Sequence, residues 1–171
     1  MRKSSPVFRL VITSLFAALV TVGTIVIQIP TPATNGFINF GDTLIFISGV
    51  VLGPFNGLLA GGVGSWLADM LSGYAHYAPW TLVIKGLEGL IIGLLAHRVY
   101  SKTLKLWPAM LAMLVAGAWM IFGYFIAALV MYGWVGAVES LVGNSVQALG
   151  SLAAASVLLP QIQKAWNRFQ N

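Results

Sequence analysis

Two opposite charges lie one helical turn apart in a stretch that otherwise resembles a membrane helix. Lys85 and Glu88 follow several aromatic side chains and a histidine in the segment GYAHYAPWTLVIKGLEGL, residues 73–90. A charged side chain at the centre of a bilayer costs at least about 2.5 kcal/mol, so such residues pair with one another or face a water-filled cavity. The sequence therefore predicts either a structural ion pair or a polar binding site here.

The composition indicates the class of protein that carries these charges. The chain has 171 residues, of which 58% are hydrophobic and only 8% are charged. A soluble domain of this size would need more charged residues to cover its core. We therefore predict a single polytopic membrane domain over residues 1–171. The chain has no cysteine, which excludes disulfides and thiol catalysis.

Hydropathy predicts an all-α integral membrane protein with six transmembrane helices. A spanning helix needs about 20 mainly apolar residues, and the predicted helices cover residues 8–28, 41–54, 56–72, 80–100, 106–132 and 137–160. The second and third are short and are joined by a tight turn at Gly53-Pro54, so they form one hydrophobic hairpin. The first apolar run is too long for a signal peptide and lacks an Ala-x-Ala-like cleavage site, so we expect a retained helix.

The basic residues predict the orientation of the six helices, because Lys and Arg favour the cytoplasmic side. All but one lie at the N-terminus, between the fourth and fifth helices, or at the C-terminus: Arg2, Lys3, Arg9, Arg98, Lys102, Lys105, Lys164 and Arg168. Six spans place these regions on one side, whereas five would separate the two ends. We expect both termini in the cytoplasm of a multi-pass protein of the bacterial cytoplasmic membrane. No face gathers these residues into a groove, so nucleic-acid binding is not expected.

This topology places the remaining charges in the outer half of the membrane. Lys85 would lie about 7 Å and Glu88 about 12 Å below the outer surface, at a rise of 1.5 Å per residue. The other acidic residues are Asp42, Asp69 and Glu139, all near outer helix ends. These groups either line a cavity that opens outward or pair with one another. An ion pair between Lys85 and Glu88, or one linked to Asp69, would fix the bundle, and the two roles can coexist.

Polar and aromatic side chains at the same end complete a candidate binding site. Asn144 and Gln147 belong to a stripe, with serines on either side, that either bonds neighbouring helices or faces a ligand. Aromatic rings near the outer surface serve as membrane anchors or as flat walls for a ring-shaped ligand. The candidate substrate-binding residues are Asn39, Asp42, Asp69, Tyr74, His76, Tyr77, Trp80, Lys85, Glu88, Glu139, Asn144 and Gln147. Ordering of the outer loops is the alternative role for Asn39, Asp42 and Asp69.

Several kinds of chemistry are not expected from this sequence. There is no P-loop for ATP, and His76 and His97 map to opposite membrane sides, so neither a metal site nor a bound cofactor is predicted. The stretch around Ser65 weakly resembles an intramembrane serine protease, but the chain lacks the histidine on a helix that such an enzyme needs. We therefore expect a binding or transport protein and not an enzyme.

Four short motifs carry a resemblance to a known family. They are Asn39-Phe40-Gly41-Asp42, the Gly53–Gly57 turn, Gly64-Ser65-x-x-x-Asp69, and the segment from Gly73 to Gly86 with Tyr74, Tyr77, Thr81 and Lys85. Together they resemble the S components of energy-coupling factor (ECF) vitamin importers. The sequence is most similar to the riboflavin-type group, within it to members assigned to hydroxymethylpyrimidine or pyridoxine-like substrates. The resemblance covers about residues 8–165 and is carried mainly by the second to fourth helices.

The resemblance implies a substrate-binding subunit that works with a membrane coupling (T) subunit and two ATPase (A) subunits. It implies an outer pocket closed by the loop after the first helix, here residues 29–39. Family members often dock on the coupling subunit through an Ala-x-x-x-Ala motif on that helix. This chain has Ser14-x-x-x-Ala18 instead, with Ala17 beside it, so these residues are the candidate docking positions. The alternative function is a stand-alone transporter or channel without ATPase partners.

Overall fold

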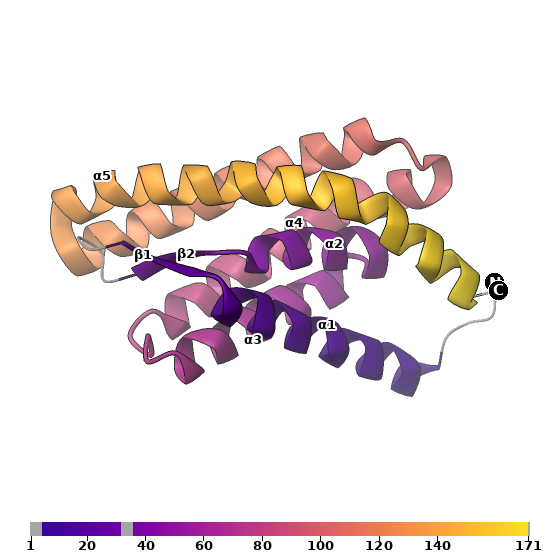
Figure 1. The fold of residues 1–171 in the computed structure, drawn as a ribbon, viewed down its shortest axis with the longest axis horizontal. Coiled ribbons are helices and arrows are strands. Elements are labelled where there is room, and N and C mark those ends of the chain that lie inside the picture. Colours follow the sequence, from indigo (N-terminus) through magenta and orange to yellow (C-terminus); the bar gives the residue numbers. More distant parts are fainter. Residues whose placement is uncertain (1–4, 32–35, 171) are drawn as a thin grey trace.

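The computed structural model describes residues 5–31 and 36–170, with side chains as far as residue 169. The elements in chain order are α1 (Pro6–Val26), β1 (Gln28–Thr31), β2 (Gly36–Asn39), α2 (Gly41–Leu52), α3 (Pro54–Leu71), α4 (Ala78–Thr103) and α5 (Leu106–Gln170). The last helix reverses direction at Gly133, which has φ 73° and ψ −167°. We call residues 106–132 its first arm and residues 134–170 its second arm, and Figure 1 shows the two arms running antiparallel.

The positions of the helices agree with those predicted from hydropathy, and their lengths differ. α4 begins two residues earlier than expected and ends three residues later, and the second arm of α5 continues ten residues beyond 160. By length and composition, α1, α4 and α5 are apolar enough to cross a membrane, and α2 is a shorter apolar helix. The described chain is therefore a helical bundle of membrane type, while the number of spans and the cytoplasmic termini stay predictions.

Capping and special backbone angles set the helix boundaries. The Ser5 hydroxyl accepts a hydrogen bond of 3.2 Å from the Phe8 amide, and Pro6 follows in the first helical turn, where its missing N–H is harmless. Gly53, at φ 90°, separates α2 from α3. Leu104, at φ 51°, ends α4 in the left-handed conformation. These three helix boundaries thus have a local cause.

The connection after α1 is a β-hairpin where the sequence predicted a loop. β1 and β2 pair antiparallel, with Ile29 opposite Ile38 and Pro30 opposite Phe37. The prolines favoured a loop because proline cannot donate a ladder hydrogen bond. In a two-stranded sheet each strand has a free edge, so Pro30 is tolerated there. The all-α prediction is therefore corrected by one short hairpin. Pro32, Arg2 and Lys3 lie outside the described residues.

The helix α2 is the centre of the bundle. It packs against α1, α3, α4 and α5, and nearly all of its side chains are buried, from Asp42 and Thr43 through Ile45 to Val51. Aromatic and aliphatic side chains of α4 and α5 close around it, among them Ile92, Tyr100 and Met113. This apolar core occupies the part of the molecule nearer the two chain ends, and the buried charged side chains Asp42, Lys85 and Glu88 lie beyond it in the direction of the hairpin.

The small residues on α3 and α4 bring these helices into backbone contact. A Cβ atom added to Gly57 would lie 2.5 Å from the Gly89 carbonyl oxygen, and one added to Gly61 would lie 2.6 Å from the Lys85 oxygen. A Cβ atom essentially never lies this close to a heavy atom to which it is not bonded, so only glycine fits at these positions. The close approach fixes α4, and with it the side chain of Lys85, relative to α2 and α3.

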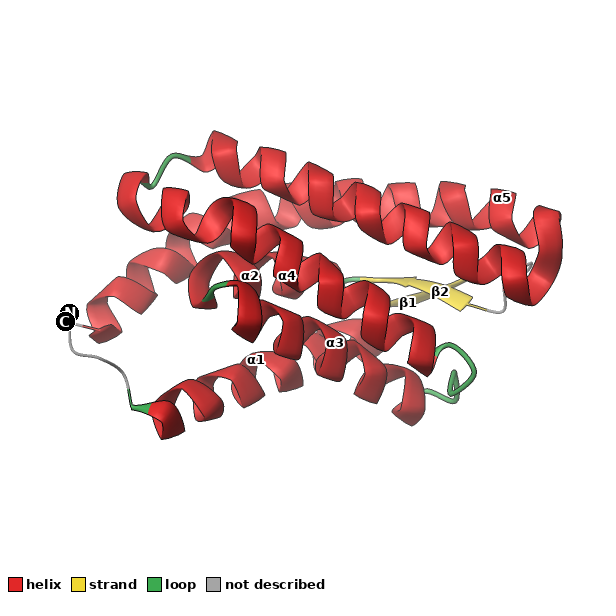
Figure 2. Ribbon diagram, turned by 180° about the vertical axis from the view of Figure 1, so that it is seen from behind, coloured by secondary structure: helices red, strands yellow, loops and turns green. Residues whose placement is uncertain are grey.

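The two ends of the bundle differ in what they contain. The β-hairpin, the α3–α4 turn and the reversal at Gly133 lie at one end, which we call the hairpin end. The chain termini, the α2–α3 turn and the α4–α5 connection lie at the other, which we call the terminus end (Figures 1 and 2). Basic residues flank the terminus end, where Arg98 and Lys102 are in the last turns of α4.

The close contact of α3 and α4 gives a testable prediction for stability. Gly89→Ala would place its Cβ against the backbone of Gly57, so we expect a loss of about 1–3 kcal/mol, typical of overpacking. Gly86→Ala is the matched control on the same helix, because the nearest atom to its Cβ would be 3.5 Å away. Alanine also favours a helix over glycine by about 1 kcal/mol. Thermal unfolding in detergent should show Gly89→Ala below the wild type and Gly86→Ala at or above it. Equal midpoints would contradict the assigned packing.

Candidate ligand-binding site

A pocket of about 570 Å³, including the space at its open mouth, lies at the hairpin end. Its wall is formed by both hairpin strands, the end of α3, the start of α4 and both arms of α5. The lining residues are Thr31, Gly36, Phe37, Ile38, Asn39, Asp69, Tyr77, Thr81, Tyr124, Ala128, Ser140, Gly143, Asn144 and Gln147. Because residues from five elements meet here, the pocket exists only when the bundle and the hairpin are assembled together.

The polar lining combines one carboxylate with amide and hydroxyl groups. Asp69 and Thr81 are buried, with residue exposures of 5% and 3%, on neighbouring helices α3 and α4. The Thr81 hydroxyl is 3.0 Å from the Tyr124 hydroxyl, which holds the phenol of the first α5 arm against α4. Asn144 is half-buried on the second arm. A ligand in this pocket would therefore meet hydrogen-bonding groups from several sides.

Two tyrosine rings provide the flat surfaces of the pocket. The ring centroids of Tyr77 and Tyr124 are 6.5 Å apart at 59°, and Tyr77 is also 6.0 Å from Tyr132. Rings at these separations and angles contact one another favourably and hold their positions. The lining thus has aromatic faces next to polar groups, which is the composition typical of sites for small organic ligands.

The hairpin is attached to the bundle by hydrogen bonds at its last residue. The backbone N–H of Asn39 donates to the Gln147 side-chain oxygen at 2.7 Å. The Asn39 side-chain oxygen accepts from the backbone N–H of Gly41 at 2.8 Å. The first contact joins β2 to the second arm of α5, and the second contact caps the start of α2. Asn39 is therefore part of the wall of the pocket and also the residue that fixes that wall.

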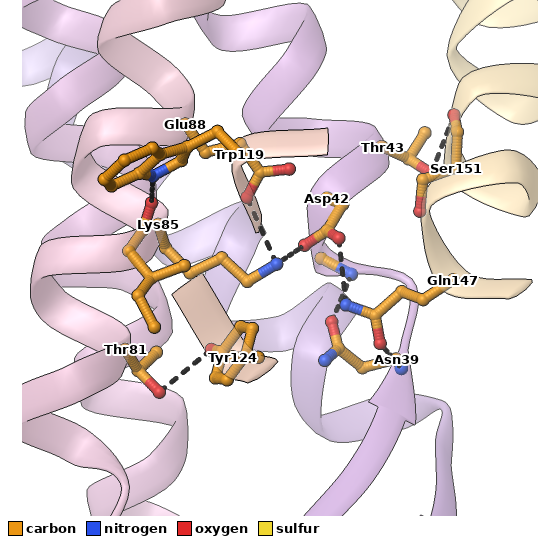
Figure 3. A network of polar contacts seen from close by, with 12 residues as sticks. Asn39, Asp42, Thr43, Thr81, Lys85, Glu88, Trp119, Tyr124, Gln147 and Ser151 are labelled. Atoms are coloured by element: carbon orange, nitrogen blue, oxygen red, sulfur yellow. Dashed lines mark hydrogen bonds and ion pairs between the residues drawn. The ribbon is translucent and has the colours of Figure 1, made fainter. Parts of the chain in front are cut away.

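Below the pocket, a buried ion cluster joins α2, α4 and α5 (Figure 3). The Lys85 ammonium donates to Asp42 and lies 3.1 Å from a Glu88 oxygen. The Gln147 amide donates to the second Asp42 oxygen at 2.9 Å. All of these residues are at most 4% exposed. Two carboxylates thus share one ammonium, and Gln147 connects the cluster to the hairpin through Asn39.

The cluster is held in place by further contacts around Lys85. Its ammonium lies 5.4 Å from the centre of the Tyr124 ring, a distance at which a cation is attracted to the aromatic face. The Trp119 indole donates to the Ile84 carbonyl at 3.0 Å, which joins the first α5 arm to α4 one residue from Lys85. Tyr124 therefore contacts both the pocket and the cluster beneath it.

The structure divides the predicted site residues into groups. Those that line the pocket are Asn39, Asp69, Tyr77, Asn144 and Gln147. Those that form the ion cluster, outside the pocket lining, are Asp42, Lys85 and Glu88. The predicted pairing of Lys85 with Glu88 is present, and the additional partner is Asp42 in place of Asp69.

The other predicted residues lie around the pocket without lining it. Tyr74 packs on Phe37 of the hairpin with ring centroids 4.6 Å apart, and His76 is exposed. Trp80 packs against the small apolar cluster between α4 and α5. Glu139 is half-buried on the second α5 arm. The aromatic cluster before α4 therefore contributes only Tyr77 to the pocket.

Sequence reasoning missed some of the lining residues. Tyr124 was not among the candidates, although a phenol in the interior of an otherwise apolar segment is an available signal. Phe37 and Thr31 were missed because they face the pocket only when the connection after α1 forms a hairpin. Gly143 and Ala128 were missed because small apolar residues have no chemical signature.

The candidate docking residues on α1 face different ways. Ser14 and Ala18 are exposed, whereas Ala17 is buried. A Cβ atom on Gly64 of α3 would lie 2.6 Å from the Ala17 oxygen, and the nearby Thr21 hydroxyl donates to the Gly64 oxygen at 2.8 Å. One small-residue row thus packs α1 on α3, and the row that contains Ser14 and Ala18 faces outward.

Comparison with known proteins agrees with a role in transport. The chain is 28% identical over 157 residues to the thiamine precursor transporter HmpT of Lactococcus lactis, covering 91% of this chain and 88% of that protein. It is 43% identical over 134 residues to an uncharacterized protein of Pyrococcus woesei, covering 78% and 86%. A UPF0397 protein of Streptococcus pneumoniae is 36% identical over 89 residues, which is 52% of this chain and 46% of that one.

One family model matches nearly the whole length of the bundle. The sequence model of the ECF-type riboflavin transporter S component matches residues 5–164, from the cap of α1 into the second arm of α5. This family consists of transporter components and not of enzymes, which agrees with the expectation from the sequence. The chain therefore belongs to the ECF-type riboflavin transporter S component family.

Proposed function

We propose that this protein is the substrate-binding S component of an ATP-driven ECF-type importer for a small heteroaromatic vitamin or vitamin precursor. In this proposal a coupling subunit and two ATPase subunits supply the movement and the energy, since the chain has no P-loop. The observation that carries the proposal is the pocket at the hairpin end, where Tyr77 and Tyr124 adjoin Asp69 and Asn144. Flat apolar faces beside a few polar groups suit a small ring with polar substituents.

The pocket and one relative support the proposed substrate class. HmpT is a thiamine precursor transporter, and this chain is similar to it over most of its length. A pyrimidine or pyridine ring with hydroxymethyl groups offers donors and acceptors around a flat centre. Thr81, Asn144 and Asn39 would meet such groups, while Gln147 and the ion cluster hold the wall. We therefore propose a hydroxymethylpyrimidine or pyridoxine-like substrate.

The orientation in the membrane completes the proposal. Basic residues favour the cytoplasmic side, and Lys102 and Lys105 lie at the terminus end. The pocket at the hairpin end then opens to the exterior, and the hairpin between α1 and α2 is its cover. The coupling subunit would dock on the outward face of α1, where Ser14 and Ala18 are exposed and small. Small residues permit close helix approach within a bilayer.

Binding and uptake measurements test this function against the alternative of a stand-alone transporter. The purified chain should bind hydroxymethylpyrimidine or pyridoxine stoichiometrically, as followed by titration calorimetry. In liposomes the chain alone should show no sustained uptake of the bound compound, and uptake should require the coupling subunit, both ATPases and ATP. Accumulation by the chain alone would favour the stand-alone transporter. The absence of any binding to vitamin-like rings would overturn the proposal.

Asn144 provides a prediction for affinity. Its replacement by alanine removes an amide from the pocket wall, so we expect Asn144→Ala to weaken ligand binding by about 1–3 kcal/mol. Gln161→Ala is the control, because Gln161 is an exposed amide on the same arm of α5 near the terminus end. Calorimetry should show unchanged affinity for the control. The same affinity in both variants would remove Asn144 from the site.

Lys85 provides a prediction for stability. Lys85→Met leaves Asp42 and Glu88 buried without their shared cation, and breaking a buried ion pair in this way costs about 3–5 kcal/mol. Lys102→Met on the same helix is the matched control, because Lys102 is exposed. Thermal unfolding in detergent should separate the two variants clearly. Equal unfolding midpoints together with lost binding would show that Lys85 contacts the ligand directly.

The outward face of α1 provides a prediction for assembly. Ala18→Trp adds a large side chain at an exposed position, so we expect unchanged folding and ligand binding but loss of ATP-dependent uptake by the complete importer. Val142→Trp is the control, since Val142 is exposed on the second arm of α5. Copurification with the coupling subunit measures the docking step directly. Normal copurification and uptake with Ala18→Trp would place the docking surface elsewhere.

A further inference from the structure

The pocket contains one carboxylate with an oxygen that the described residues leave unpaired. Asp69 is 5% exposed, it lines the pocket, and its Oδ2 atom has no hydrogen-bond partner among the described residues. Its neighbour Thr81 hydrogen-bonds with Tyr124 and also interacts with the Asp69 carboxylate, which leaves Oδ2 as the unpaired oxygen. The nearest cation of the pocket region, Lys85, is engaged by Asp42 and Glu88. The acidic character of the pocket therefore comes from Asp69.

We propose that Asp69 recognises an N–H donor on the ring of the ligand and so determines which heteroaromatic compound binds. This inference rests on the proposed function and narrows it to one chemical class. The class is an aminopyrimidine, in which an exocyclic amino group stands next to a ring nitrogen. The exocyclic amino group presents an N–H that can donate to the unpaired Asp69 oxygen.

The energetics favour such a ligand over similar rings without the donor. A hydrogen bond to an ionised group is about twice as strong as one between neutral groups. A ring that fills the pocket but offers no donor leaves the Asp69 oxygen buried and unpaired, and sites built around a hydrogen bond reject such analogues strongly.

The experiment compares two ligands that differ only at this edge. One is 4-amino-5-hydroxymethyl-2-methylpyrimidine, and the other is 5-hydroxymethyl-2-methylpyrimidine, which lacks the amino group and has no N–H on its ring. Calorimetry with the full chain measures Kd for both compounds in the wild type and in Asp69→Asn. The wild type should prefer the amino compound. We expect Asp69→Asn to weaken its binding at least tenfold and to leave binding of the compound without the amino group unchanged or improved, because the Asn amide can donate to the unprotonated ring nitrogen.

A matched control separates recognition from a general effect of charge. Glu139 is another carboxylate with an unpartnered buried oxygen, and it lies outside the pocket lining. Glu139→Gln should therefore keep the wild-type preference. The unfolding temperature of each variant shows whether the bundle is intact.

Each other outcome overturns the inference in a distinct way. An equal loss of affinity for both compounds in Asp69→Asn would make Asp69 a structural residue, and no loss would remove it from recognition. If the wild type binds pyridoxine but not the aminopyrimidine, this inference fails while the proposed function stands. If the wild type binds neither ring, both fail.

Discussion

The architecture depends on the pairing of one buried ammonium group. Lys85 lies in an apolar helix, and an unpaired charge there would oppose folding within a membrane. Its partners come from two directions, Glu88 on its own helix and Asp42 on α2. Because the Lys85 ammonium must reach Asp42, α4 and α2 pack together at one position along their lengths. The glycine contacts between α3 and α4 allow the backbones to approach closely enough for this.

The same constraint extends to the wall of the pocket. Asp42 is also bonded to Gln147, and Gln147 is bonded to the end of the hairpin at Asn39. A chain of short contacts thus joins the buried ion cluster to the strand that borders the pocket (Figure 3). The side chains that meet a ligand are then held before it arrives, which lowers the ordering cost of binding. The charges that form the buried ion cluster and the carboxylate that lines the pocket are separate groups.

The sequence predicts the helices well because their signal is local. Apolar runs broken by Gly53-Pro54 and by Gly133 mark the boundaries, and the structure places them within a few residues. The hairpin was not predicted, because Pro30 disfavours a strand unless both strands are edges. Pairings within one helix, such as Lys85 with Glu88, follow from spacing alone. The pairing of Lys85 with Asp42 does not follow from spacing, because no local pattern shows which residues of α2 and α4 lie side by side in the bundle.

The central position of α2 has a consequence for how the protein enters its membrane. At 12 residues the helix is about 18 Å long, which is shorter than the hydrocarbon layer of about 30 Å. It also carries Asp42, so it is a poor candidate for independent insertion by the translocation machinery. Neighbouring helices cover it on every side. The segment must therefore reach its final depth during biogenesis together with α3, and it becomes shielded from lipid only after α4 and both arms of α5 have been synthesised.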